Sequence, residues 1–336
     1  AVIAIVLVSR QVTERCRIDW LGTLVLAAGL SGVILYTSLG GTTYAWDAPW
    51  MLAAISASVA LLALFPLVEA RAAEPIVPLE LFRNATFRTT SAIGFVIGFA
   101  LFGSVTFIPV YLQLVKGYSA TGSGLLLTPM MLGVLVTSTA SGFLISRYGS
   151  YRRFPRAGTA LAAVALYLLS TLEPGTPTWA AGLYMLLLGL GLGLVMQVLV
   201  LAAQNAVDYT LLGVATSGAT LFRQVGGSIG VSVFGAIFTN RLGVELAHRL
   251  PPGVQVPTDA TPAAIEQLPT AINAIYAAAV AAALHPVFQT AAAVMVVGFA
   301  LSWRLRDVPL RETTQAPVEA SERALRTLAG SSASDG

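Results

Sequence analysis

Long apolar stretches separated by short charged segments dominate the sequence. A transmembrane helix needs about 20 mostly apolar residues to cross a hydrocarbon core of about 30 Å. Stretches of this kind, uninterrupted by charge except for Arg156 at the start of the fifth and Arg223 in the seventh, predict eight spans at residues 20–39, 49–68, 90–115, 122–145, 154–172, 178–203, 213–239 and 286–303. Closed helices explain this pattern better than the weak alternation of a transmembrane barrel. The sequence therefore predicts an all-α polytopic membrane helical bundle.

A ninth apolar stretch, AVIAIVLV at residues 1–8, is too short to cross a bilayer, and no Met begins the chain. A processed signal peptide would not leave an apolar stub directly before charged residues. We expect residues 1–18 to be the end of a truncated helix and a cytoplasmic loop. On this interpretation we expect the chain to be the C-terminal part of a longer protein.

The composition agrees with a membrane protein. Hydrophobic residues make up 56% of the chain and charged residues 10%, against roughly 25% charged in soluble proteins. The single cysteine, Cys16, excludes a disulfide scaffold. The net charge of +3 comes from scattered basic residues, so we expect no nucleic-acid partner.

The basic residues predict the orientation, because cytoplasmic loops are enriched in Lys and Arg. The opposite loops hold only Lys116, Arg241 and Arg249, and Arg223 lies within a span. The other basic residues all fall in alternate segments, which places the first loop and the C-terminus in the cytoplasm: Arg10, Arg15, Arg17, Arg71, Arg83, Arg88, Arg147, Arg152, Arg153, Arg156, Arg304, Arg306, Arg311, Arg323 and Arg326.

Two segments lie outside the predicted spans. An outer loop is expected over 240–285; it is rich in Pro and then carries the run AINAIYAAAVAAAL, which either lies on the outer surface or extends the last span. The tail over 306–336 is polar and offers too little apolar surface to fold alone. We expect it to be disordered and cytoplasmic.

Glycines recur at helical spacing in two spans, with Gly94 and Gly98 in the third and Gly226 and Gly230 in the seventh. Small residues let helices approach closely in lipid. Static packing is one interpretation, and faces that slide during alternating access are the other. Pro109 and Pro129 remove backbone donors and are expected to kink their helices.

Arg223 is the charge inside a span. A span that began after it would have too few residues to cross, so Arg223 lies at least one turn inside. Its guanidinium either snorkels toward the cytoplasmic interface or faces a cavity or the bundle interior, where charges are costly and usually functional.

Uncharged polar and sulfur side chains at membrane depth are candidates for one wall of a mildly polar cavity. Each of them alone is more often a helix-to-helix hydrogen bond or core filling. Together with Arg223, the candidates are Tyr111, Gln113, Met130, Met196, Gln197 and Gln224.

The sequence shows no motif or residue spacing typical of an enzyme or a metal site. No Asp or Glu lies well inside a predicted span, and His248 and His285 lack metal-ligand spacing. Phosphate-binding loops, nucleophile elbows and dinucleotide fingerprints are also missing. We therefore expect no cofactor, no metal site and no catalytic residues.

Several stretches, in order, carry a family resemblance: RIDWLGTLVLAAGLSGVILY from Arg17, PLELFRNATFR from Pro78, FGSVTFIPVYLQLVKGYSATGSGLLLTP from Phe102, LLLGLGLGLVMQ from Leu186, QNAV from Gln204 and LGVATSGATLFRQVGGSIGVSVFGAI from Leu212. In these stretches the chain resembles the C-terminal portion of the fourteen-helix drug:proton antiporters of the major facilitator superfamily, the EmrB/QacA group.

The resemblance implies a domain organisation. Residues 19–70 would be a helix pair inserted between two halves, 71–89 a cytoplasmic linker, and 90–305 the C-terminal six-helix transport bundle. The loop after Gly142 is similar to the superfamily's cytoplasmic loop motif, with Ser146 in place of its Asp and Ser150 in place of an Arg; the matching residues are Gly142, Arg147, Gly149, Arg152 and Arg153.

The resemblance also implies secondary active transport across the cell membrane: export of small lipophilic, often cationic, compounds in exchange for protons. Two bundles would rock against each other in the lipid bilayer, and the missing N-terminal half would carry the proton-titrating acid. A polytopic transferase and an inactive remnant or scaffold are the alternatives.

Overall fold

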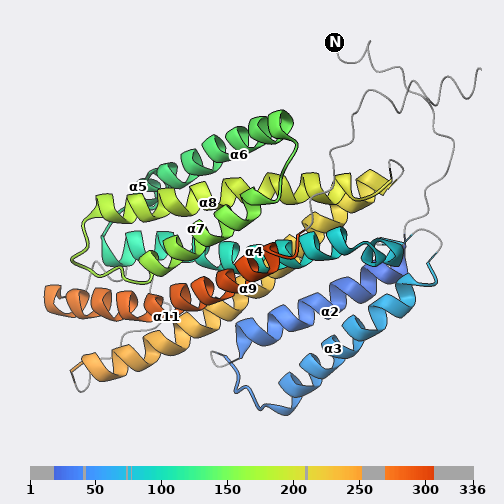
Figure 1. Ribbon diagram of the computed structural model, residues 1–336. Coiled ribbons are helices and arrows are strands. Elements are labelled where there is room, and N and C mark those ends of the chain that lie inside the picture. Colours follow the sequence, from blue (N-terminus) through green and yellow to red (C-terminus); the bar gives the residue numbers. More distant parts are fainter. Residues whose placement is uncertain are drawn as a thin grey trace, which may run out of the picture.

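The computed structural model describes residues 19–40, 43–72, 75, 76, 78–208, 211–251 and 269–305, and most of these residues lie in helices (Figure 1). The elements are α2 (Trp20–Leu39), α3 (Pro49–Glu69), the 3₁₀ helix η1 (Leu79–Arg83), α4 (Ala85–Val110), the π-helical turn η2 (Tyr111–Val115), α5 (Ala120–Leu126), α6 (Thr128–Tyr148), α7 (Arg153–Leu169), α8 (Thr178–Asn205), α9 (Leu212–Arg249) and α11 (Thr270–Ser302).

The predicted all-helical membrane fold is confirmed. Within the described residues, seven helical segments are long and apolar enough to cross a membrane, with α5 and α6 together forming one of them. The eighth expected span is α7, whose 17 residues extend about 26 Å at 1.5 Å per residue. That length is at the short end of what a bilayer requires.

Figure 1 shows a hairpin of α2 and α3 beside a bundle of the other long helices. Helices α2 and α3 pack against each other, and α2 also contacts α9. In the bundle, α4 packs against α9, α11 and α8, while α8 also packs against α6 and α7. The core of the bundle is a cluster of buried apolar side chains that includes Ile97, Leu166, Leu188 and Phe288.

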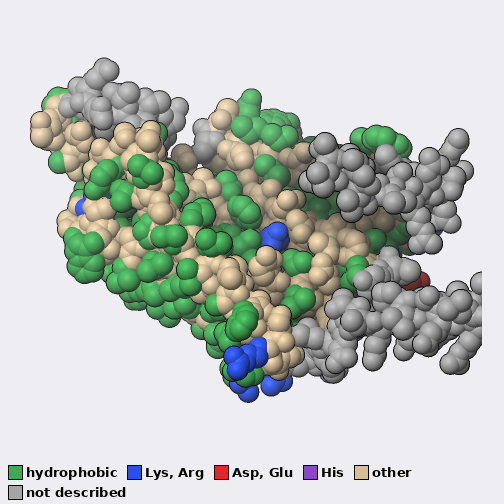
Figure 2. All heavy atoms as spheres, turned by 90° about the horizontal axis from the view of Figure 1, so that it is seen from above, with side chains coloured by type: hydrophobic (Ala, Val, Ile, Leu, Met, Phe, Trp, Pro, Cys, Tyr) green, Lys and Arg blue, Asp and Glu red, His purple; other side chains and the backbone are tan. Residues whose placement is uncertain are grey.

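The outer surface of this fold is apolar. Large hydrophobic side chains are exposed along α2, α3 and α6, for example Leu24, Leu64 and Leu135. Figure 2 shows a face made mostly of hydrophobic and uncharged groups, with Lys and Arg gathered in few places. Such a surface suits lipid, because a water-soluble monomer rarely exposes apolar patches of this extent.

Glycines set the contact between α4 and α9. A Cβ atom at Gly98 would overlap the carbonyl oxygen of Arg223, and a Cβ at Gly226 or Gly230 would overlap the carbonyl oxygens of Phe95 or Phe99. At Gly94 the contact is looser, with 3.6 Å to the carbonyl oxygen of Ala219. The four glycines singled out in the sequence therefore all lie where these two backbones meet.

Helix α8 uses glycine on two sides. A Cβ at Gly189 would overlap the backbone of Met130 in α6, and one at Gly191 would lie 2.7 Å from the carbonyl oxygen of Gly158 in α7. These two glycines thus allow two different helices, α6 and α7, to approach the backbone of α8 closely.

Pro109 lies beside a change of helix type, and Pro129 beside a break between two α-helices. Pro109 precedes the π-helical turn η2 by two residues, and Pro129 follows the break between α5 and α6 at Leu127. A proline lacks the N–H that would continue the helical ladder, so each of these two predicted spans is an interrupted helix.

The expected outer loop over 240–285 is helical at both ends, because α9 continues to Arg249 and α11 begins at Thr270. The Ala-rich run therefore extends the last span, which was one of the two alternatives. The run is helical because Ala is the best helix former. Hydropathy marks only the part of a helix that crosses the lipid, so it did not predict that α9 and α11 continue beyond it. The expected stub and loop at 1–18 and the tail at 306–336 lie outside the described residues.

We predict that Gly226→Ala destabilises the protein by about 1–3 kcal/mol, the usual cost of overpacking, because its Cβ meets the backbone of α4. Gly235→Ala, in the same helix, is the matched control, since a Cβ there meets no atom within 4 Å. Thermal unfolding in detergent compares the two variants. Equal midpoints for both would show that the α4–α9 contact does not depend on the missing Cβ.

Candidate functional site

Uncharged polar side chains meet where α8 ends and α9 begins. Nε2 of Gln204 donates a hydrogen bond to Oγ1 of Thr216 at 2.9 Å, and that hydroxyl donates to the carbonyl oxygen of Leu212 at 2.7 Å. The two helices are thereby joined by side chains close to the connection between them.

Asn84 positions this connection relative to α4. Its Oδ1 accepts hydrogen bonds from the backbone N–H of Thr86 at 2.9 Å and of Phe87 at 3.3 Å, and so caps the start of α4. Its Nδ2 donates to the carbonyl oxygen of Ala206 at 2.6 Å. One side chain thus holds the start of α4 and the end of α8 together.

A pocket of about 730 Å³ opens beside these groups, within the range of small-molecule sites. It is lined by Ile76, Gln204, Leu212, Gly213, Thr216, Ser217, Gly218, Thr220, Leu221 and Gln224. None of these described lining residues is charged. The wall can offer amide and hydroxyl hydrogen bonds together with apolar contact, which suits an amphiphilic molecule.

The lining follows from the two faces of α9. Gly213, Thr216, Thr220 and Gln224 recur every three or four residues and so share one face. Gly226 and Gly230 lie on the face that packs against α4. Fixing the glycine face against α4 therefore directs the polar face toward the pocket.

Of the candidate cavity residues, Gln224 lines this pocket. Gln197 is exposed on α8, seven residues before Gln204 and so on the same side of that helix. Met196 is partly buried beside it, and Met130 is buried in α6. The structure thus brings Gln224 together with Gln204, which was not among the candidates.

Arg223 is partly buried and does not line the pocket. Its backbone lies against Gly98 of α4. Among the described residues, its guanidinium has no hydrogen bond or ion pair.

Tyr111 and Gln113 lie at the other end of the bundle. Tyr111 is buried, and its hydroxyl donates to the carbonyl oxygen of Glu173 at 2.8 Å, just before α8 begins. Gln113 donates from Nε2 to Oγ of Ser123 at 2.9 Å. Helix α8 has 28 residues and is about 42 Å long, so these two side chains are far from Gln204.

The same end is held by further contacts to the α7–α8 loop. Nζ of Lys116 donates to the carbonyl oxygens of Pro174, at 2.6 Å, and of Thr176. A ring nitrogen of His285 lies 3.0 Å from the carbonyl oxygen of Leu172. Side chains from η2, from Lys116 directly after it and from α11 thus contact carbonyl groups of one loop.

The candidate cytoplasmic loop motif surrounds the turn between α6 and α7. Gly149 ends α6 with a φ of 71°, a conformation that side chains other than glycine rarely adopt. Gly142, Arg147, Arg152 and Arg153 are exposed. Nearby, Arg156 lies 4.3 Å from the ring centre of Trp303, so this turn and the end of α11 are at the same end of the molecule.

Thr216, Ser217 and Thr220 of α9, together with Gln204 of α8, are the part of the site that sequence reasoning missed. Thr216, Ser217 and Thr220 precede Gln224 at helical spacing, and this periodicity is the signal that could have found them. Among the described residues, no group of three or more His, Cys, Asp or Glu could hold a metal ion.

Comparisons with known proteins agree with this fold. Residues 1–231 match the Major Facilitator Superfamily. The chain is 46% identical over 88% of its length to an uncharacterised MFS-type transporter of Mycobacterium tuberculosis, Rv1877, and spans 43% of that protein. It is 31% identical to the multidrug transporter protein MdtP of Bacillus subtilis, over 95% of this chain and 64% of that one.

A third relative is the tetracycline resistance determinant of Streptomyces rimosus, 37% identical over 68% of this chain and 67% of that protein. Among solved structures, a bacterial homologue of the human lysosomal transporter Spinster, in an inward-facing and occupied conformation, has a TM-score of 0.53 at 15% identity. That match covers 85% of this chain and 65% of the other.

The family match covers more than half of the chain, and the relatives are transporters rather than enzymes. The helices and the match together identify a multi-pass membrane protein that belongs to the Major Facilitator Superfamily.

Proposed function

We propose that this chain is part of an efflux transporter that exports small lipophilic compounds in exchange for protons. The observation that carries the proposal is the uncharged, amphiphilic pocket between α8 and α9. Its volume suits a drug-sized molecule. Relatives named as a multidrug transporter and a tetracycline resistance determinant support an efflux role.

We further propose that the protein has the fourteen-helix arrangement, with a second helical bundle opposite the one described. The hairpin of α2 and α3 supports this, because it contacts the bundle through α2 and α9 and leaves α3 exposed at its side. The exposed face of α6 offers apolar surface to such a bundle. The proton-titrating acid would then belong to that second bundle.

The proposed location is the plasma membrane, with the C-terminus in the cytoplasm. The arrangement of the basic residues supports this orientation: Arg147, Arg152 and Arg153 lie at the turn that Arg156 joins to the end of α11. Cytoplasmic segments are the ones enriched in Arg.

Arg223 would act in the transport cycle rather than in the recognition of a cation. A partly buried charge without a partner is costly, and the described part of the bundle supplies Arg223 with no carboxylate. A carboxylate of the second bundle, or an anionic group of the substrate, would stabilise it in one state of the cycle.

For the pocket, we predict that Gln224→Leu in the intact transporter raises the KM for a hydrogen-bonding substrate about threefold to tenfold, the effect of losing one hydrogen bond of about 0.5–1.5 kcal/mol. Gln289→Leu is the matched control, because Gln289 is exposed on α11 away from the pocket. Transport kinetics in proteoliposomes give the comparison. A KM unchanged in the first variant, or changed equally in both, would remove the pocket from the substrate path.

For Arg223, we predict that Arg223→Gln leaves the unfolding temperature in detergent unchanged or higher, because it removes a partly buried charge that has no partner, while transport falls at least tenfold. Both measurements are made on the same preparation. Full transport by the variant would show that Arg223 has no role in the transport cycle. A large loss of stability would show that its role is to stabilise the fold.

For proton coupling, we predict that proteoliposomes containing the transporter accumulate substrate only when a pH gradient is imposed, and that a protonophore abolishes the accumulation. Liposomes without protein serve as the control for passive partition of a lipophilic compound. Accumulation that persists without any gradient would contradict antiport.

A further inference from the structure

A second cavity, of about 460 Å³, lies between the hairpin and the bundle. Its walls come from the end of α2, the loop that follows it, α9 and α11. The lining residues are Thr37, Trp46, Val233, Ala236, Ile237, Asn240, Arg241 and Pro286. It is separate from the pocket between α8 and α9, with which it shares no lining residue.

The cavity is apolar at one end and polar at the other. Val233, Ala236 and Ile237 line its apolar part, and Asn240 and Arg241 line its polar end. From Val233 to Arg241 the helix advances eight residues, or about 12 Å. That distance corresponds to a phospholipid headgroup and glycerol followed by the first part of an acyl chain.

Trp46 is held in the wall of the cavity by local packing. Its ring lies so close to Gly40 that a Cβ there would overlap it. The ring also makes an edge contact with Tyr36, with centroids 5.2 Å apart, and Tyr44 and Trp50 form a second such pair at 4.4 Å. Trp and Tyr concentrate at the headgroup level of membranes, so this cluster marks the polar end of the cavity as interfacial.

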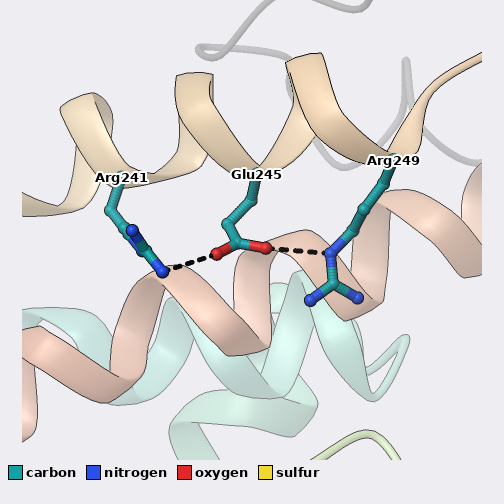
Figure 3. Close-up of polar contacts among 3 residues, drawn as sticks. All are labelled: Arg241, Glu245 and Arg249. Carbon is teal, nitrogen blue, oxygen red and sulfur yellow. Dashed lines mark hydrogen bonds and ion pairs between the residues drawn. The ribbon is translucent and has the colours of Figure 1, made fainter.

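Arg241 supplies the charge at that end (Figure 3). Glu245 forms an ion pair with Nη2 of Arg241 and accepts a hydrogen bond from Nε of Arg249, both at 2.9 Å. The three side chains together carry one net positive charge. The side chain of Arg241 is 51% exposed, and a guanidinium has five donors, so further donors remain for an anion.

We propose that this cavity binds one phospholipid with an anionic headgroup, whose phosphate lies against Arg241 and Asn240 and whose acyl chain follows Val233, Ala236 and Ile237. A soluble anion would not use the apolar part. The lipid would also join the hairpin to the bundle, where Ser38 donates a long hydrogen bond of 3.4 Å to Ser232. Besides Glu245, which pairs with Arg241, the acidic residue Asp47 lies exposed beside Trp46 in the same loop.

The test is native mass spectrometry of the protein in detergent with phosphatidylglycerol or phosphatidylcholine of identical acyl chains. We expect the unaltered protein to retain phosphatidylglycerol about tenfold more strongly. Arg241→Gln removes this preference, while Arg88→Gln, at an exposed Arg of α4, keeps it. Glycerol phosphate, the headgroup without chains, does not bind.

A second variant tests the apolar part. Ala236→Trp fills the cavity and reduces retention of both lipids, with the unfolding temperature recorded to show that the protein is folded. Three results would overturn the proposal: an unchanged preference in Arg241→Gln, full retention of both lipids by folded Ala236→Trp, or binding of glycerol phosphate as tight as that of the lipid.

Discussion

Direct backbone contact between α4 and α9 is the constraint on which the rest of the structure depends. Burial of apolar surface gives helices little reason to associate in lipid, so close packing at small residues takes its place. At Gly98, Gly226 and Gly230 no atom stands between one helix and the carbonyl oxygens of the other. This contact fixes the rotation of α9 about its own axis, and therefore decides which of its side chains face away from α4.

That rotation gives the protein its candidate site. With the glycine face against α4, Thr216, Thr220 and Gln224 face the pocket, and Gln204 reaches them from α8. Helix α8 is itself held on two sides, by α6 at Gly189 and by α7 at Gly191. The shape of the pocket thus depends on backbones, while its chemistry depends on a few polar side chains that the packing does not use.

The sequence predicted the membrane helices well because length and apolarity are local properties. It placed the ends of α9 and α11 poorly, since pairs such as Arg241 with Glu245 and an Ala-rich run continue a helix outside the lipid, where hydropathy gives no signal. For the site, Gln224 could be found as a polar residue at depth. The partner of Tyr111 could not, because a carbonyl group 62 residues away leaves no trace in a side-chain pattern.

The two faces of α9 can be compared most directly by labelling single cysteines after Cys16→Ser, which removes the chain's one native thiol. Thr220→Cys lies in the pocket, and Ala219→Cys is its neighbour on the buried face toward α4. We expect Thr220→Cys to react fast with a hydrophilic maleimide and Ala219→Cys to react little. Equal rates at both positions, or faster labelling at position 219, would contradict the orientation of α9 on which the site depends.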